Sequence, residues 1–372
     1  MLIGSPIAPL PAPAPLVQSI KSIEVTNTDE GRDGFEITFG IGRSGPASLL
    51  DYDIMANPLL RENNRVILVA YMGFTPYVLI DGIIRFHQSS IGGEPGQSTF
   101  KITGEDISCI MGLEERTKPW PNTPTPGVVA SIVSNYAKYG IKPLPIPPAL
   151  MDVPIVLDRT PMQRNTDLDY IHKLARSSSS VFYVEPDAVP GTTTAYWGPP
   201  SLGGFAMEPL NVNMGADTNV VGSINFQNNP VSVTLVRGSI IDRTTGARVP
   251  IMTFTSTRPP LSTQPAWLVN QPNVRTRQYT GDGGVNMIQA MSEAQSETDR
   301  SVNVLTGTGE IDATRYGSIL RARRLVQVRG TGYQHDGLYY VKSVTHKIKR
   351  GEYKQSFVIT REGYGSTIPG VI

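Results

Sequence analysis

Side chains able to carry out catalysis are few and scattered in this 372-residue sequence. The single cysteine, Cys109, excludes a disulfide framework and a multi-cysteine zinc site. The four histidines show no H-x-x-x-H spacing, and the sequence contains neither a G-x-x-x-x-G-K-[ST] phosphate loop nor a G-x-S-x-G nucleophile elbow. We therefore predict no catalytic residue, no metal site and no cofactor.

Two further features allow a catalytic and a structural explanation. Asp167 and Asp169 could form a carboxylate pair of the kind that glycosidases use, but acidic residues at a helix start are also favoured by the helix dipole. His346 shares one strand face with Val344 and Ile348, which is more typical of a hydrogen-bonded histidine in a core than of a catalytic group. We favour the structural explanation for both.

A basic stretch near the C-terminus is the most distinctive electrostatic feature. Between residues 321 and 361, ten basic residues are accompanied only by Asp336 and Glu352. Such a stretch can be a solvated strand face, a contact with an acidic protein or a surface near nucleic acid. Few aromatic residues are interleaved with it, which disfavours nucleic acid as a specific ligand. The candidates for a partner interface are Arg321, Arg323, Arg324, Arg329, Lys347, Lys349 and Arg350.

The overall composition is that of a folded protein with little surface charge. Lys and Arg number 33 against 32 Asp and Glu, so the chain lacks the global positive field of a dedicated nucleic-acid binder. Charged residues make up 17%, against roughly 25% in an average domain, which suggests a surface partly covered by partners. The longest apolar run, Val66 to Phe74, is far shorter than the roughly 18 residues of a membrane span. No signal-peptide pattern occurs in residues 1–15, so we expect synthesis in the cytoplasm.

Strand patterns dominate both ends of the chain. Residues 1–18 contain several prolines and predict an extended arm, either a flexible tail or a segment that docks on a neighbouring subunit. Residues 19–115 contain successive strands and a short helix, with alternation such as Phe35, Ile37 and Phe39. Strands return in residues 216–363, interrupted by an amphipathic helix at about 284–302, and a short tail follows at 364–372. The two β parts could be versions of one module, although no sequence repeat is visible.

The middle region, residues 116–215, predicts a small α+β domain. Thr125 can cap a helix that Gly140 ends, with Pro126 in its first turn. Thr166 and Asp169 resemble a capping box at the start of a second helix. The apolar residues from Val181 to Val184 predict a strand after that helix. The fold class that follows is mainly β with an α+β insertion.

Two segments in a fixed order resemble a known family. The first is Arg159-Thr-Pro-Met-Gln-Arg-Asn-Thr-Asp-Leu-Asp-Tyr-Ile-His-Lys-Leu-Ala-Arg, followed by Val181-Phe-Tyr-Val. The second is Gly330-Thr-Gly-x-x-x-x-Gly-Leu-Tyr-Tyr-Val-x-x-Val-x-His346-x-Ile, followed by Gly351-x-Tyr353-x-x-x-Phe357 and Arg361-x-Gly363. A weaker third likeness is Phe100-Lys-Ile-Thr-Gly-Glu-Asp-Ile-Ser. Together they resemble phage late control protein D and the hub half of VgrG spikes.

This resemblance implies a structural hub of a contractile tail or injection machine. It implies two tube-like antiparallel β-barrels per chain, a homotrimer with a pseudo-sixfold ring, and no enzymatic activity. The ring would adapt a hexameric inner tube, or a tube-initiator protein, to a trimeric spike, and would contact other baseplate proteins in an assembled particle. Nothing after residue 363 resembles a spike domain, so a separate spike protein is implied.

Two alternatives from other classes stay open at this point. One is a β-rich glycan or peptidoglycan hydrolase that uses carboxylates not recognisable in the sequence. The other is a carbohydrate-binding protein that acts alone, although only three tryptophans are available for sugar stacking.

Overall fold

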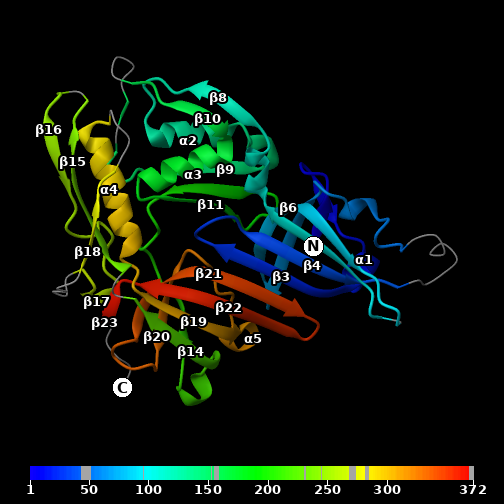
Figure 1. Cartoon of the computed structure of the whole chain (residues 1–372). Coiled ribbons are helices and arrows are strands. Elements are labelled where there is room, and N and C mark those ends of the chain that lie inside the picture. Colours follow the sequence, from blue (N-terminus) through cyan, green and yellow to red (C-terminus); the bar gives the residue numbers. More distant parts are fainter. Residues whose placement is uncertain are drawn as a thin grey trace.

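The computed structural model describes residues 1–42, 52–94, 96–151, 153–154, 159–229, 232–243, 245–267, 274–280 and 285–367. A sheet of 13 strands contains segments from both ends of the chain. In Figure 1 it extends from the blue and cyan strands on the right to the red and orange strands below, with the α+β region above it. The mainly β fold with an α+β insertion is therefore confirmed.

The first sheet unit is built from residues 20–106. Its strands are β3 (Ile20–Thr28), β4 (Gly34–Gly40), β5 (Arg65–Met72), β6 (Thr75–Ser90) and β7 (Thr99–Asp106). They are all antiparallel, in the order β3-β4-β7-β6-β5. Buried and partly exposed residues alternate along β4 and β7, because one face of the sheet covers the core and the other does not. A 3-10 turn, η2 (Pro58–Leu60), precedes β5.

The second sheet unit is built from residues 220–361 and repeats this arrangement. Its strands are β14 (Val220–Asn228), β19 (Leu305–Asp312), β20 (Leu325–Arg329), β21 (Gly337–Lys349) and β22 (Glu352–Arg361). Their order is β14-β19-β22-β21-β20, again with every pair antiparallel. Each unit thus has five strands with the same order across the sheet. Numbered as they occur along the chain, that order is first, second, fifth, fourth and third. β13 (Met207–Asn211), which pairs with β20 in parallel, and η5 (Gly215–Asp217) precede the unit, and α5 (Ala313–Tyr316) lies between β19 and β20.

Irregularities in the two units also coincide. The ladder between β6 and β7 shifts register between Ile84 and Phe86, where β6 has one extra residue. The ladder between β21 and β22 shifts at the corresponding place, between Val341 and Ser343. β-Bulges bend a strand locally, so a bulge at the same position indicates the same strand path. The two units are versions of one arrangement, as the sequence order had suggested.

The two units join edge to edge into one sheet. The second half of β21 pairs with β3, antiparallel, from Ser343 opposite Thr28 to Lys349 opposite Ser22. This differs from the predicted pair of separate barrels, because among the described residues neither unit closes on itself. The reason is that β3, the first edge of one unit, pairs with the other unit rather than with its own last strands.

The α+β region follows the first unit directly. Its elements are η3 (Ile107–Gly112), β8 (Glu115–Pro119), α2 (Thr125–Ser134), η4 (Ala137–Tyr139), β9 (Ile141–Pro145), β10 (Met162–Thr166), α3 (Asp167–Ser177), β11 (Val181–Pro186) and β12 (Thr193–Gly198). The predicted strand at Val181 is confirmed, and so is the cap, since the Thr166 hydroxyl accepts from Asp169 N at 3.1 Å. The Thr125 cap is wrong: Pro124 holds the cap position and Thr125 is already helical. Gly140 ends the segment with φ 81°, a value that favours glycine.

The N-terminal segment folds back on its own chain. β1 (Leu2–Gly4) pairs with β5, β2 (Pro9–Pro11) pairs with β1, and α1 (Ala14–Gln18) leads into β3. The expectation of a flexible tail is wrong for these residues, because β1 pairs with the edge of β5 and β2 pairs with β1. The outer side of this hairpin leaves Ile7 and Leu10 exposed.

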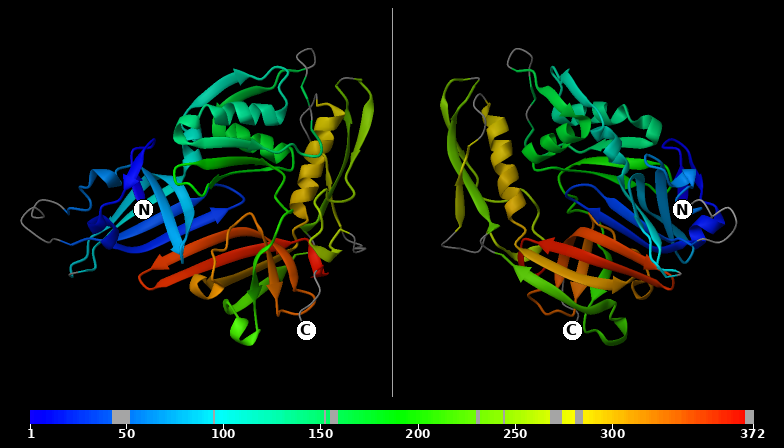
Figure 2. Two further views of the ribbon diagram at one scale, coloured as in Figure 1. Left: turned by 180° about the vertical axis from the view of Figure 1, so that it is seen from behind. Right: turned by 45° about the vertical axis from the view of Figure 1, so that its right-hand side comes forward.

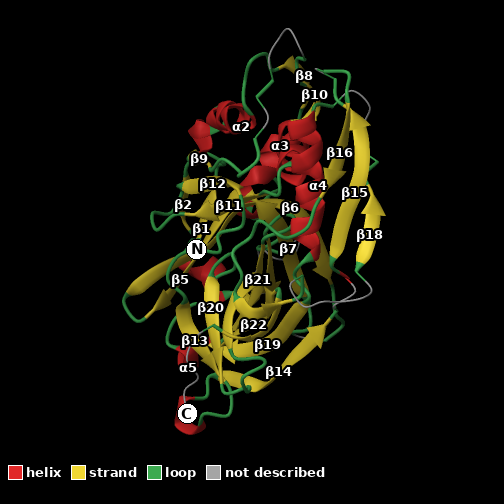
Figure 3. Ribbon diagram, turned by 90° about the vertical axis from the view of Figure 1, so that its left-hand side faces the viewer, coloured by secondary structure: helices red, strands yellow, loops and turns green. Residues whose placement is uncertain are grey.

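A small second sheet covers α4 (Met287–Ser301). It consists of β15 (Thr234–Ile241), β16 (Arg248–Met252) and β18 (Arg275–Gln278), and a further strand pair joins β17 (Ser262–Pro265) to β23 (Gly363–Ser366). Figure 3 shows α4 between α3 and the small sheet, and Figure 2 shows that α4 and the α+β region lie on the same side of the large sheet. The predicted helix at 284–302 is confirmed. Residues 368–372 of the predicted tail lie outside the described residues. No helix in the described ranges combines the length and the apolar character needed to cross a membrane.

Candidate functional site

The joint between the two sheet units is the first candidate site. At its centre the hydroxyl oxygens of Thr26 and Thr345 lie 3.1 Å apart across the strand pair. This is an internal example of how the edge of one unit recognises the edge of the other.

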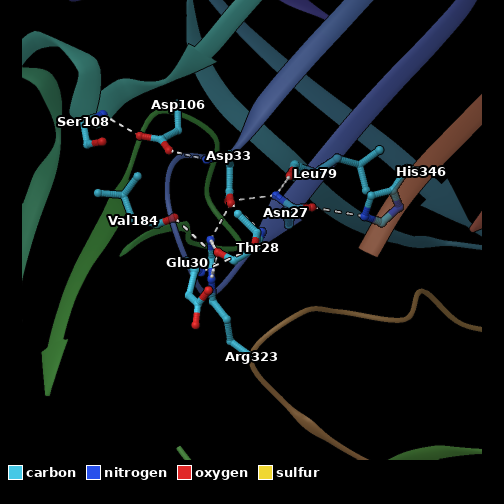
Figure 4. A network of polar contacts seen from close by, with 10 residues as sticks. All are labelled: Asn27, Thr28, Glu30, Asp33, Leu79, Asp106, Ser108, Val184, Arg323 and His346. Carbon is cyan, nitrogen blue, oxygen red and sulfur yellow. Dashed lines mark hydrogen bonds and ion pairs between the residues drawn. The ribbon is translucent and has the colours of Figure 1, made fainter. Parts of the chain in front are cut away.

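A buried arginine fastens the joint from the side (Figure 4). Arg323 Nη2 donates to Asp33 Oδ1 at 2.5 Å and Nε donates to the Thr28 carbonyl at 3.0 Å. The guanidinium also lies over the Tyr183 ring, 4.1 Å from its centroid, so it connects both units to the α+β region. The side chains of Arg323 and Asp33 are only 4% and 1% exposed. Arg323 has φ 66°, a strained value for a side chain of this size, which these contacts must offset.

Asp33 is the centre of the network in Figure 4. Its carboxylate accepts from Asn27 Nδ2 at 2.9 Å and from Thr28 N at 2.8 Å, besides Arg323. Its own backbone N–H donates to Asp106 at 2.7 Å. Burial, and then the charge of Asp33, raise the pKa of Asp106 to about 6. The loop between β3 and β4 is thereby tied to the end of β7.

His346 completes the network on the other side of Asn27. It is 2% exposed, with Nε2 3.2 Å from Asn27 Oδ1 and Nδ1 2.9 Å from the Tyr353 hydroxyl. Burial, and then the charge of Arg321, lower the pKa of His346 to about 3. The ring is therefore neutral, with Nε2–H donating to Asn27 and Nδ1 accepting from Tyr353. The structural role expected of His346 is confirmed.

Two strand edges without partners form the second candidate site. β5 pairs with β6 only as far as Ile83, just as β20 pairs with β21 only as far as Tyr340. Beyond that point β21 receives β3, whereas β6 has no strand on that side among the described residues. β14 likewise pairs with β19 alone within the described part of the chain. Edges of this length present unpaired N–H and C=O groups, and natural proteins protect them or use them for association.

Both edges are accessible. On β6, the five residues from Phe86 to Ser90 are exposed, with Phe86 at 67%. On β14, most residues between Val221 and Asn228 are exposed. Each edge belongs to a strand that is paired on its other side, β6 with β7 and β14 with β19.

The sheet face opposite the cores is polar and its charges are balanced. Lys101 Nζ lies 2.8 Å from Glu36, and Lys347 and Lys354 each lie 3.8 Å from Glu310. Exposed ion pairs of this kind contribute roughly 0–1 kcal/mol each to folding stability, so these pairs add little to the stability of the sheet.

The predicted interface residues are not all together. Arg323 is buried in the joint, Arg324 donates to both Glu185 oxygens at 2.9 Å, and Arg321 lies over the Tyr77 ring. Arg329 donates to Gln327 within β20. The exposed members share the end of β21 and the turn after it: Lys347, Lys349 and Arg350. A partner contact through these three stays a prediction.

The acidic partners of the buried arginines were not predicted from the sequence. Besides Asp33, these include Asp81, whose carboxylate makes two 2.6 Å contacts with Arg65 deep inside the first unit. Arg65 also donates to the Pro6 carbonyl, and Thr193 donates to Asp81, so this pair ties the N-terminal hairpin and the α+β region to the sheet. Nothing in the sequence distinguishes these acids from surface ones. Asp33 lies in a turn and Asp81 within an apolar strand, and only the fold pairs them.

The remaining chemical candidates are engaged in structure. Asp167 accepts from Tyr136 and Gln163, and Asp169 accepts from the Thr166 hydroxyl. Cys109 is buried, which raises the pKa of its thiol to about 12. Within the described ranges, no group of three or more His, Cys, Asp or Glu side chains is arranged to hold a metal ion.

Solved structures share this fold along almost its whole length. The 43 kDa tail protein of prophage MuSo2 from Shewanella oneidensis matches with a TM-score of 0.64 at 11% identity, covering 92% of this chain and 94% of that one. A tail protein from Neisseria meningitidis MC58 matches with a TM-score of 0.61 at 11% identity, covering 93% of each chain. The Escherichia coli c3393 protein, a component of a type VI secretion system, matches with a TM-score of 0.55 at 11% identity, covering 93% of this chain and 76% of that one.

No protein-family model matches the chain, and no curated protein matches it in sequence. The likeness is therefore one of fold. At that level the resemblance stated from the sequence is confirmed: the chain has the fold of phage tail proteins and of a related secretion-system component.

Proposed function

We propose that this chain is a non-enzymatic hub subunit of a contractile tail or injection particle. Three copies form a ring with pseudo-sixfold symmetry, which adapts a hexameric inner tube to a separate trimeric spike. The fold shared with phage tail proteins supports this proposal, and its residue-level basis is the repeated sheet unit. Tube-initiator and other baseplate proteins would contact the same ring.

The observation that carries the proposal is the internal joint. The four steps from β6 through β7, β4 and β3 to β21 are each antiparallel, and this even number leaves β6 and β21 pointing the same way. The two units are therefore repeated along the sheet without inversion, and equivalent ends lie on the same rim. Repetition of this kind leaves one complementary pair of edges free. Such heterologous contacts produce a ring when the rotation closes.

The free edges would then pair between chains as β3 and β21 pair within one. The coincident bulges align Phe86 of β6 with Ser343 of β21, which makes Gln88 equivalent to Thr345. The ladders with β4 and β19 make Gln227 of β14 equivalent to Thr26. The contact of Thr26 with Thr345 thus predicts that Gln88 of one chain faces Gln227 of the next.

The ring would place the polar sheet face toward its channel. The cores, the α+β region and α4 occupy the opposite face, so only the polar face remains free to line a passage. Its balanced charges suit a channel that lets a substrate pass without binding it tightly.

A disulfide cross-link tests this register. The variant Gln88→Cys/Gln227→Cys contains only one other cysteine, the buried Cys109. Opposed positions in adjacent strands meet the Cα separation of roughly 4.4–6.8 Å that a disulfide requires. After mild oxidation of the purified chain and of particle-producing cells, we expect covalent species up to the trimer on non-reducing gels.

The matched control is Gln88→Cys/Val221→Cys. Val221 and Gln227 lie opposite Glu310 and Thr306, four residues apart on β19, so the second cysteine is displaced along the edge by roughly 13 Å at 3.3 Å per residue. It should give no trimer, and neither should either single variant. Equal cross-linking in the control, a ladder that continues beyond the trimer, or no cross-link in both settings would contradict the proposed ring.

A further inference from the structure

A polar cavity of about 380 Å³ lies between the large sheet and the C-terminal ends of α3 and α4. Tyr340 and Lys342 of β21 and Thr360 of β22 line it from the sheet side. Arg176 and Arg300 line it from the last turns of the two helices, and Arg258 from the segment before β17. Its volume is at the lower end of the range for small-molecule sites.

Three arginines line this cavity without a direct ion pair, although the charges of Asp299, Asp29 and Glu30 are close enough to favour the charged form of Arg258. The side chains of Arg176, Arg258 and Arg300 have no ion pair or hydrogen bond with any residue that the structure describes. Burial lowers the pKa of Arg258, and burial followed by the charges of Arg258 and Arg176 lowers the pKa of Arg300. Like charges held close together in a partly dry cavity are unfavourable until an anion joins them.

Unsatisfied polar atoms in the cavity wall are a second, independent observation. Arg258 Nε, Tyr340 Oη and Thr360 Oγ1 are fully buried and have no hydrogen-bond partner. A buried donor left in this state costs roughly 1–3 kcal/mol, and such groups are rare in folded proteins. All three atoms can donate, whereas the same wall holds one acceptor without a partner, Asp29 Oδ1, so unpaired donors outnumber unpaired acceptors there.

The acidic residues of the wall do not supply that acceptor. Glu362 already accepts from Leu261 N, Ser262 N and the Ser262 hydroxyl. Glu30 lies 3.2 Å from Lys342. Asp29 makes no hydrogen bond through its buried Oδ1, and burial raises its pKa to about 6, so it takes up a proton more easily than an ordinary carboxylate.

Favourable interaction with helix dipoles is not a sufficient explanation. Positive charge at a helix C-terminus is favourable, which accounts for Arg176 and Arg300. The last carbonyls of α3, however, already receive hydroxyl donors: Ser296 donates to the Arg176 carbonyl and Ser292 to the Ser177 carbonyl. Arg258, which belongs to no helix, would still lack a partner.

We propose that this cavity binds an oxyanion, carried by a small phosphorylated or carboxylated ligand. Arg258 would provide the central charge, with Tyr340 and Thr360 donating from the sheet. Arg176 and Arg300 would close over the ligand from the helix ends. The proposal goes beyond the hub function and does not depend on ring formation.

Titration of the purified chain with inorganic phosphate and, separately, with citrate tests it, at constant ionic strength and by calorimetry. We expect saturable binding of at least one anion, weakened tenfold or more by Arg258→Gln and partly restored by Arg258→Lys. The matched control is Arg248→Gln, an exposed arginine bonded to Ser239 on the small sheet, which should bind as the wild type does.

The two probes also identify the ligand class. Tighter binding of phosphate favours a phosphorylated ligand, and tighter binding of citrate favours a carboxylated one. Absence of saturable binding for both anions, or equal affinity in the wild type and in correctly folded Arg258→Gln, overturns the proposal. Circular dichroism establishes that the variants are folded before the titration.

Discussion

Removal of one member of the Arg323–Asp33 pair should weaken the joint between the sheet units. Arg323→Met keeps most of the side-chain volume but removes the charge, the donors to Asp33 and Thr28, and the contact with Tyr183. Asp33→Asn keeps the shape of the side chain but removes its negative charge. Arg323 then stays buried with only backbone acceptors and the Tyr183 ring as partners. Both changes leave one buried charge without its counter-ion.

The burial of the pair sets the expected magnitude. Breaking a buried ion pair costs about 3–5 kcal/mol, because the remaining charge stays desolvated. Arg323→Met belongs at the lower end, near 3 kcal/mol, since Asp33 still accepts from Asn27 and Thr28. In the double variant Arg323→Met/Asp33→Asn both charges are gone. Its loss of unfolding free energy should therefore be smaller than the sum of the losses in the two single variants by about 2 kcal/mol.

Urea unfolding followed by far-UV circular dichroism provides the free energies for the double-mutant cycle. Arg32 and Glu105 form the matched control pair, because Arg32 adjoins Asp33 in the same loop and its ion pair of 2.7 Å is about a third exposed at both ends. Arg32→Met and Glu105→Gln should each cost less than about 1 kcal/mol, with little coupling.

Two results would refute this reasoning. One is a coupling energy for Arg323 and Asp33 no larger than that of Arg32 and Glu105. The other is a loss of less than about 1 kcal/mol for Arg323→Met, which would mean that water solvates the joint in spite of its burial.

Two further predictions follow from the same region. His346 binds a proton below about pH 6.5 in the unfolded chain but only near pH 3 in the folded chain, so the free energy of unfolding should decrease as the pH falls from 6.5 toward 3. The expected decrease at pH 5 is about 2 kcal/mol. Urea midpoints measured at pH 7.5 and pH 5 should show this decrease in the wild type and not in His346→Gln. Charge reversal in Lys349→Glu/Arg350→Glu should leave the circular dichroism of the chain unchanged and lower the yield of assembled particles, whereas normal yield would remove these residues from the partner interface.

The sequence was informative where local patterns decide structure. Alternation along Phe35, Ile37 and Phe39 correctly predicted a strand with one buried face, and Thr166 with Asp169 correctly predicted a helix start. It was uninformative for short strands without a pattern, such as β1 and the Pro-rich β2, which form because the edge of β5 pairs with β1 and β1 pairs with β2. The basic stretch shows the same limit. Its charges are visible in the sequence, but only tertiary contacts reveal that Arg323 is internal and Lys349 is not.

The most instructive failure concerns the repeat, which the sequence conceals although the structure displays it. At one equivalent cross-strand pair, the first unit has Phe35 opposite Gly104 and the second has Gly307 opposite Ile359. A Cβ on Gly104 would lie 2.3 Å from the Phe35 ring, and one on Gly307 would lie 2.9 Å from Ile359 Cγ1. Each pair thus accommodates one large side chain and one glycine, but on opposite strands. Close packing constrains the volume of the pair rather than the residue at each position, so the units can keep one geometry while their aligned residues become unrelated. Edge pairing depends on backbone groups, so it should persist after sequence similarity is lost, and the ladder between β3 and β21 is therefore the best guide to the proposed contact between chains.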